Sequence, residues 1–139
     1  MEVQDEIRRG DTSHPLLGEL LRAEWLGDPI RMTEPAELMA IERIRWALGG
    51  TDARPDRHRG EAATIVAAER LGGVAVLDDR DARALAAARG VPIVGTEGIL
   101  RACGSDQQLG WDDAWAIFSE MRRIGVRLRD LTVDQFRSG

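Results

Sequence analysis

The stretch RGEAATIVAAERLGGVAVLDDRDARALAAARGVPIVGTEGILRACG, residues 59–104, decides the fold. Apolar residues at helical spacing after Glu61 predict a helix. That helix ends at Gly72-Gly73, because glycine readily adopts the left-handed backbone that ends a helix. The apolar runs 74–77 and 91–94 predict two short strands, the first buried on both faces. A second helix over 82–89 separates the strands and a third begins after Gly95-Thr96, so the block predicts an α/β fold.

Acidic residues stand at the start of the first helix and directly after the first strand. Glu61 opens the helix, and Asp78, Asp79 and Asp81 follow the strand. Ligands of an open α/β sheet bind at the carboxyl ends of its strands, and a right-handed crossover allows Glu61 to share that edge. Gathered carboxylates repel one another unless a cation joins them, and Mg²⁺ and Mn²⁺ prefer oxygen ligands. The pattern therefore indicates a divalent-metal site.

The same acids also have a purely structural interpretation. The helix macrodipole favours an acid such as Glu61 in the first turn of any helix. The residues from Asp78 to Asp81 can equally cap the helix that follows them. Spacing alone leaves the structural and the metal-binding interpretations equally open.

Three segments carry a family resemblance: GEAATIVAAERLGG (60–73), VAVLDDRDAR (74–83) and GTEGIL (95–100). Together they resemble the C-terminal half of PIN-domain proteins. The similarity is closest to the branch of predicted nucleic-acid-binding proteins related to ribonuclease toxins of toxin–antitoxin modules, and it extends over nearly all of the chain. It implies a single PIN-like three-layer α/β/α domain over residues 1–139 with a short parallel sheet, its motif block at 60–104.

The resemblance also implies an activity and the residues that carry it. The activity is a metal-dependent ribonuclease that hydrolyses RNA phosphodiester bonds with Mg²⁺ or Mn²⁺, with RNA and an antitoxin as partners. The family's helix glutamate falls on Glu6, as a direct or water-mediated metal ligand, and its helix-start acid falls on Glu61. The acid after the fourth strand falls on Asp78 or Asp79, so Glu61, Asp78 and Asp79 are the implied catalytic acids and metal ligands.

The N-terminal region departs from the family pattern. Family members begin with a strand that carries an aspartate in a hydrophobic-Asp-[Thr/Ala]-Ser pattern. Asp11-Thr12-Ser13 has those letters, but it follows the loop-like Arg8-Arg9-Gly10 and is better explained as a helix cap. We therefore expect an N-terminally truncated fold whose strand lies upstream, comes from a completing protein partner, or is lost in a degenerate copy.

Two other classes of function follow from these observations. The first is a catalytically inactive PIN-like module that acts by binding protein or nucleic acid. The second is a phosphatase-like or nucleotide-binding site at the strand edge, but the sequence contains no phosphate loop to support it.

Arginines close to the acids are candidates for binding phosphate. Arg57 and Arg59 lie in the polar loop TDARPDRHR (51–59), and Arg83 lies one turn beyond the aspartates. Arginine pairs with phosphate oxygens in a bidentate manner, which suits an RNA backbone. A solvated loop and a surface ion pair are the corresponding structural interpretations.

Composition limits the remaining possibilities. The net charge of −5 argues against a surface that coats nucleic acid broadly, although bound cations offset an acidic pocket. The single Cys103 permits no internal disulfide. No apolar run approaches a membrane span and no signal-peptide core is present, so we expect a cytoplasmic protein without membrane contact.

Outside the central block, the apolar spacing predicts further elements. A Trp-rich helix over 111–124 is expected to pack in the core, with a homodimer surface as the alternative. The other predictions are a brief strand over 30–32 and helices over 1–9, 15–26, 35–48 and 130–136. For the helix over 35–48 we expect Thr33 as the cap and Leu38 among the buried residues.

Overall fold

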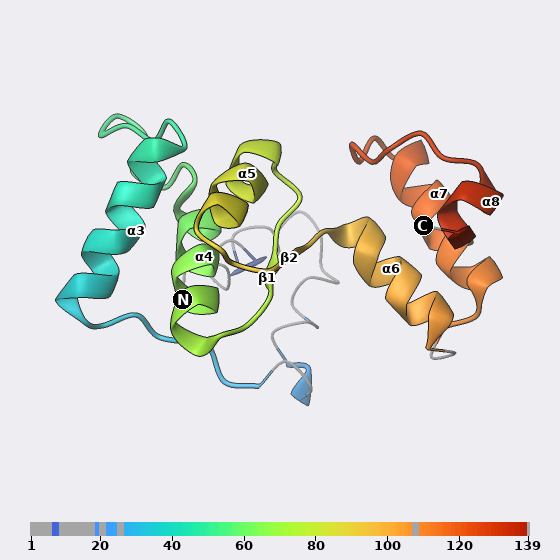
Figure 1. The fold of residues 1–139 in the computed structure, drawn as a ribbon, viewed down its shortest axis with the longest axis horizontal. Helices are drawn as coiled ribbons and strands as arrows, with labels where there is room; N and C mark the ends of the chain where they lie inside the picture. Colours follow the sequence, from blue (N-terminus) through green and yellow to red (C-terminus); the bar gives the residue numbers. More distant parts are fainter. Residues whose placement is uncertain (1–6, 9–18, 20–21, 25–26, 107–108, 139) are drawn as a thin grey trace. The chain divides into compact units, whose positions relative to one another are not determined.

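The computed structural model describes residues 7–8, 19, 22–24, 27–106 and 109–138. Its elements are shown in Figure 1 and are, in chain order, α3 (Pro35–Ala47), α4 (Arg59–Leu71), β1 (Ala75–Val76), α5 (Arg80–Ala88), β2 (Ile93–Val94), α6 (Thr96–Ser105), α7 (Trp111–Arg123) and α8 (Val133–Ser138). The predicted helices over 1–9 and 15–26 fall largely outside the described residues.

Contacts within the chain divide it into two compact units. The first unit comprises residues 1–75 and 79–92, and the second comprises residues 76–78 and 93–139. The division falls within the β1 strand, so the strand pair contributes residues to both units. The prediction of one domain over residues 1–139 stays a prediction.

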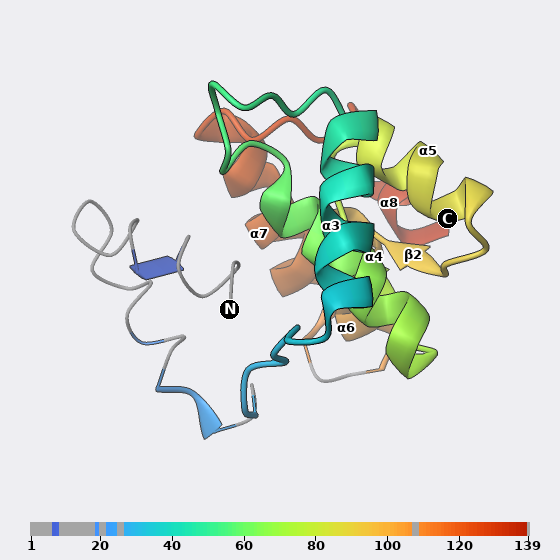
Figure 2. The same ribbon diagram turned by 90° about the vertical axis from the view of Figure 1, so that its left-hand side faces the viewer.

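Helix α4 is the centre of the first unit. It packs between α3 and α5, and Figures 1 and 2 show α3 and α4 side by side. The core is built from small and branched apolar side chains of these helices: Ile41, Ile44, Ala62, Ile65, Val66, Ala82 and Ala86. As predicted, α4 ends at Gly72, whose φ of 63° lies in the left-handed region, where glycine has no steric penalty.

Two ion pairs connect α4 to α3 and to the end of α5. Arg70 lies 2.7 Å from Glu37 of α3, and Arg89, at the end of α5, forms a bidentate pair with Glu69 at 2.7 and 2.8 Å. Both pairs involve side chains that are partly exposed, so each contributes modestly to stability.

The N-terminus of α3 is capped differently from the prediction. Glu34, rather than Thr33, is the N-cap residue and forms a capping box with Glu37. The backbone N–H groups of Thr33 and Glu34 both donate to Oε2 of Glu37, at 3.1 and 3.2 Å. Glu37 therefore connects the cap of α3 with Arg70 of α4.

Stability is expected to depend on pH through Glu37. Partial burial raises the pKa of this carboxyl, but the N–H of Glu34, the Arg70 guanidinium and the N–H of Thr33 together outweigh that effect and hold the pKa below its ordinary value of 4.5. Because the folded-state pKa is lowered, Glu37 stabilises the protein above pH 4.5 and this contribution is lost as the pH falls below it. Thermal melts should show a lower Tm for Glu37→Gln at pH 7 and convergence with the unsubstituted chain toward pH 3. A constant difference in Tm across this range would contradict the expectation.

The two strands form a short parallel sheet, as predicted for an α/β fold. The N–H of Ala75 donates to Pro92 O at 2.8 Å, and the N–H of Leu77 donates to Val94 O at 2.9 Å. The prediction that the first strand is buried on both faces is wrong. Ala75 and Leu77 are buried, whereas Val74 and Val76 are each more than half exposed, because alternate side chains point to opposite faces.

Aromatic side chains form the core of the second unit. Phe118 of α7 and Phe136 of α8 are fully buried with ring centroids 4.9 Å apart. Trp115 packs against both rings at 5.5 Å, and Trp111 meets Phe136 edge-on at 6.1 Å. The prediction that the Trp-rich helix packs in a core is confirmed.

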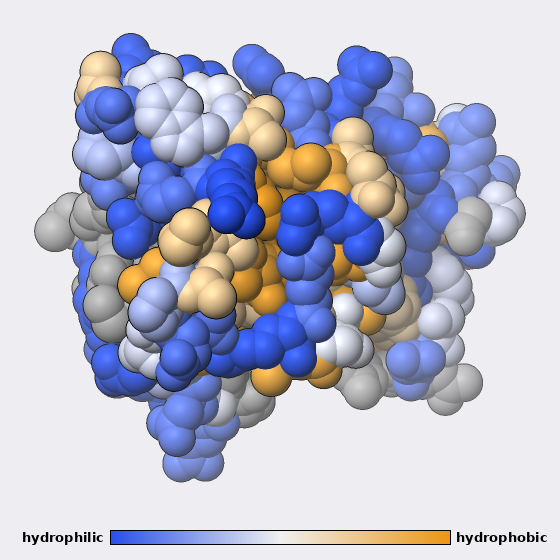
Figure 3. All heavy atoms as spheres, turned by 60° about the vertical axis from the view of Figure 1, so that its left-hand side comes forward, coloured by the Kyte–Doolittle hydropathy of each residue, from blue (hydrophilic) through white to orange (hydrophobic). Residues whose placement is uncertain are grey.

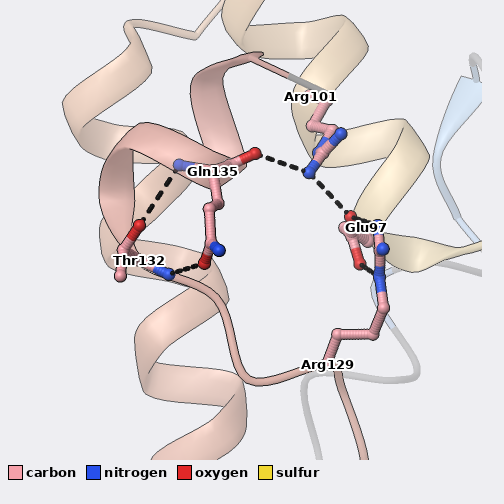
Figure 4. Close-up of polar contacts among 5 residues, drawn as sticks. All are labelled: Glu97, Arg101, Arg129, Thr132 and Gln135. Carbon is pink, nitrogen blue, oxygen red and sulfur yellow. Dashed lines mark hydrogen bonds and ion pairs between the residues drawn. The ribbon is translucent and has the colours of Figure 1, made fainter.

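A polar network joins α6 to the C-terminal segment of the second unit (Figure 4). Glu97 pairs with Arg101 at 3.0 Å and with Arg129, which donates through Nε at 2.8 Å. Arg101 also donates to the carbonyl of Gln135 at 3.0 Å, and its guanidinium lies 5.6 Å from the centre of the Phe136 ring. At the start of α8, the N–H of Thr132 donates to Oε1 of Gln135, and the N–H of Gln135 donates to Oγ1 of Thr132.

Two further predictions fail in the region of α3. Residues 30–32 do not form a strand. Leu38, predicted to be buried, is 40% exposed and lines a shallow groove of about 630 Å³ together with Met39, Glu42, Arg43 and Trp46. Figure 3 shows hydrophobic residues gathered between hydrophilic ones on the side of the molecule that it presents.

Candidate functional site

Glu61 lies in the first turn of α4, directly after a turn-rich loop. The loop is closed by a bridge between Thr51 and Arg54, and His58 takes the N-cap position of α4. The side chain of Glu61 is 35% exposed, and its Oε1 lies 3.7 Å from Nδ1 of His58. Glu61 therefore has a partly exposed carboxylate with the imidazole of His58 beside it.

Asp79 caps α5. Its Oδ1 accepts a hydrogen bond from the N–H of Ala82 at 2.8 Å, and Asp81 follows as a first-turn acid. This confirms the helix-capping interpretation for Asp79. The cap uses one of the two carboxylate oxygens, so it does not by itself prevent metal binding by the other.

Asp78 accepts two hydrogen bonds from Thr96, the first residue of α6. Its Oδ1 accepts from the N–H of Thr96 at 2.8 Å, and its Oδ2 accepts from the Thr96 hydroxyl. In the sequence, Gly95-Thr96 indicated only the start of a helix and not this hydrogen bonding to Asp78. The available signal was that parallel strands end at the same edge of a sheet, which brings Asp78 and Thr96 together.

The three candidate phosphate-binding arginines have different environments. Arg57 is exposed and donates from Nε to Nε2 of His58 at 3.0 Å. Arg59 and Arg83 are half-buried on α4 and α5. The structure thus places Arg57 beside the residue that faces Glu61, and the phosphate-binding role of all three stays a prediction.

The chemistry of the acidic side chains and their arrangement differ in how well they suit a divalent metal ion. Oxygen-only donors suit Mg²⁺ or Mn²⁺, and hydrogen-bonded carboxylates are common among metal ligands. Within the residues that the structure describes, however, no group of three or more His, Cys, Asp or Glu side chains is arranged to hold a metal ion. Glu6 lies outside the described residues. The donor chemistry suits a divalent cation, but the structure does not gather Glu61, Asp78 and Asp79 into such a group, so their joint role as ligands stays a prediction.

The fold and these acids define an α/β protein whose acidic residues stand after a parallel strand and at the start of a helix. A family model for the PIN domain matches residues 2–138, so the chain belongs to the PIN-domain family. This confirms the resemblance and the α/β fold class. PIN domains have a nuclease-like fold and typically use a divalent metal.

No curated protein and no solved structure matches the chain. None of the helices in the described ranges combines the length and the apolar character needed to cross a bilayer.

Proposed function

We propose that this PIN-domain protein is a ribonuclease that hydrolyses RNA phosphodiester bonds with Mg²⁺ or Mn²⁺. The observation that carries the proposal is the PIN-domain match over residues 2–138, together with Glu61 at the start of α4 and Asp78-Asp79 after β1. On the resemblance of its sequence to toxin ribonucleases, we extend the proposal to a cytoplasmic toxin restrained by a protein antitoxin.

In this proposal the side chains have separate tasks. Glu61 and one of Asp78 and Asp79 bind the cation, and Glu6 is a further ligand. When bound, the cation lowers the pKa of a water molecule and stabilises the charge on the leaving oxygen. Arg57, Arg59 and Arg83 contact the phosphates of the RNA through bidentate hydrogen bonds.

The decisive experiment measures metal binding and RNA cleavage with the same variants. Mn²⁺ affinity is determined by calorimetry, and cleavage of a single-stranded RNA is followed on gels. Glu61→Gln is expected to weaken Mn²⁺ binding at least tenfold, by roughly 1.4 kcal/mol, because a ligand charge is lost. RNA cleavage should fall in parallel.

Asp106→Asn is the matched control, because Asp106 is an exposed acid at the end of α6, away from the proposed ligands in the sequence. Asp78→Asn and Asp79→Asn, measured separately, identify which of the two binds the cation. If the unsubstituted chain neither binds Mn²⁺ nor cleaves RNA, the nuclease proposal fails.

A second candidate is a catalytically inactive PIN module that acts by binding a protein or a nucleic acid. Its specific support is that both aspartates make helix-terminal hydrogen bonds, Asp79 with Ala82 and Asp78 with Thr96. Saturating Mn²⁺ would then leave the Tm unchanged, whereas a cation that binds only the folded state raises it.

A further inference from the structure

His58 has an unusual backbone conformation. Its φ of 61° and ψ of 13° are left-handed, and within the described ranges it is the only non-glycine residue with a positive φ. A positive φ is uncommon for any residue other than glycine, although histidine is among the types that adopt it, and such conformations cluster at functional sites. The residue also stands next to the helix turn that carries Glu61.

The hydrogen bond from Arg57 determines which nitrogen of the His58 ring carries the proton. Nε of Arg57 donates to Nε2 of His58 at 3.0 Å, and a guanidinium has no acceptor. Nε2 must therefore present its lone pair, so the neutral ring carries its proton on Nδ1. In this tautomer Nδ1 is a hydrogen-bond donor and is unavailable as a metal ligand.

That donor is left without an acceptor. Nδ1 of His58 is buried and has no hydrogen-bond partner in the described part of the chain. Glu61 Oε1 lies 3.7 Å away, which is too long for a hydrogen bond. Because a buried donor without an acceptor is unfavourable and Glu61 is partly exposed, a small rotation of the glutamate would complete the contact.

We propose that His58 is a positioning residue for Glu61: its Nδ1–H donates to Oε1 and thereby directs Oε2 toward a divalent cation. The inference rests on the proposed metal-binding role of Glu61. Hydrogen bonds of this kind orient ligating carboxylates in metal sites, and their loss typically weakens metal binding by about 10- to 100-fold. Arg57 fixes the tautomer that makes the donation possible.

Two substitutions distinguish the effect of the Nδ1–H donor of His58 from the effect of its left-handed backbone. His58→Asn keeps an N–H donor at the same number of bonds from Cα, and asparagine tolerates the left-handed region. His58→Gly suits that backbone equally well but removes the donor. We expect Mn²⁺ affinity to fall about tenfold in His58→Gly and to remain within about twofold of the unsubstituted chain in His58→Asn.

A second measurement needs neither a variant nor a metal. Nitrogen-15 NMR of the neutral His58 ring in the unsubstituted chain should report a proton on Nδ1. A proton on Nε2, or equal Mn²⁺ affinities for the Gly and Asn variants, would overturn the inference. Circular dichroism of both variants verifies that they are folded.

Failure of this inference and failure of the proposed function give different results. Mn²⁺ binding that depends on Glu61 but is insensitive to His58 overturns only the role of His58. The absence of Mn²⁺ binding by the unsubstituted chain, or binding unaffected by Glu61→Gln, overturns the proposed function and the positioning role together.

Discussion

Phe136→Ala is expected to lower the free energy of unfolding by about 4 kcal/mol, within the range measured for buried phenylalanines. Phe136 is fully buried, and its ring contacts those of Phe118, Trp111 and Trp115. Truncation removes the apolar surface of the ring and leaves a cavity among large, stiff neighbours that cannot collapse into it. It also removes the aromatic face that lies against the Arg101 guanidinium.

Urea titration followed by circular dichroism measures this loss. Ile124→Ala is the appropriate control, because Ile124 is a large apolar residue that is mostly exposed at the end of α7. The control should change the free energy of unfolding by no more than about 0.5 kcal/mol. Similar effects of the two substitutions would show that the aromatic cluster does not determine the stability of the second unit.

Glu42→Ala is expected to destabilise the protein by about 3 kcal/mol, although Glu42 is itself 43% exposed. The reason is its partner: Arg45 is only 3% exposed and carries a permanent charge. Oε2 of Glu42 accepts from Nε of Arg45 at 2.9 Å and lies 2.8 Å from Nη2. Without it, the contacts that remain to the guanidinium from the described residues are Thr51 O at 3.1 Å and the Trp46 ring at 5.2 Å.

The matched variant is Arg45→Met, which removes the charge and keeps a long apolar side chain. Replacing a buried charge by an apolar group of similar size often costs little, since no desolvated ion remains. Thermal and urea unfolding should therefore rank Arg45→Met as more stable than Glu42→Ala. The opposite order would mean that water reaches Arg45 and compensates for the lost carboxylate.

Local signals in the sequence predicted the helices of the central block and their ends. Gly72 ends α4 with a positive φ, Asp79 caps α5, and α6 begins after Gly95. Each of these features depends on a few consecutive residues, because capping and glycine conformations are determined within one helical turn. The predicted apolar spacing of α7 also placed Phe118 in the core.

Predictions that depended on distant partners were less successful. The apolar run 74–77 indicated a strand, but not that Val74 and Val76 would be exposed, because exposure depends on what covers each face. Leu38 has the spacing of a core residue in α3 and is nevertheless exposed. The short segment Ile30-Arg31-Met32 was insufficient for a strand, because a strand requires a neighbour with which to pair.

In the candidate site, too, the sequence identified residues but not their contacts. Sequence and resemblance named Glu61, Asp78 and Asp79, but they could not show that Asp78 is held by Thr96, 18 residues further along the chain. Nor could they show that Arg57 donates to Nε2 of His58, or that Nδ1 of the same ring lies 3.7 Å from Glu61. Such contacts depend on side-chain geometry at the ångström scale, which spacing does not specify.

By itself, the sequence determined the order and ends of the main helices, the positions of the two strands and the PIN-domain family, because these follow from short-range periodicity, capping residues and motif letters. Only the tertiary structure decided the partners of the acids, the burial of Arg45 and the aromatic core around Phe136. The physical reason is that burial and hydrogen bonding depend on residues brought together from distant parts of the chain, whose packing the linear order does not encode directly.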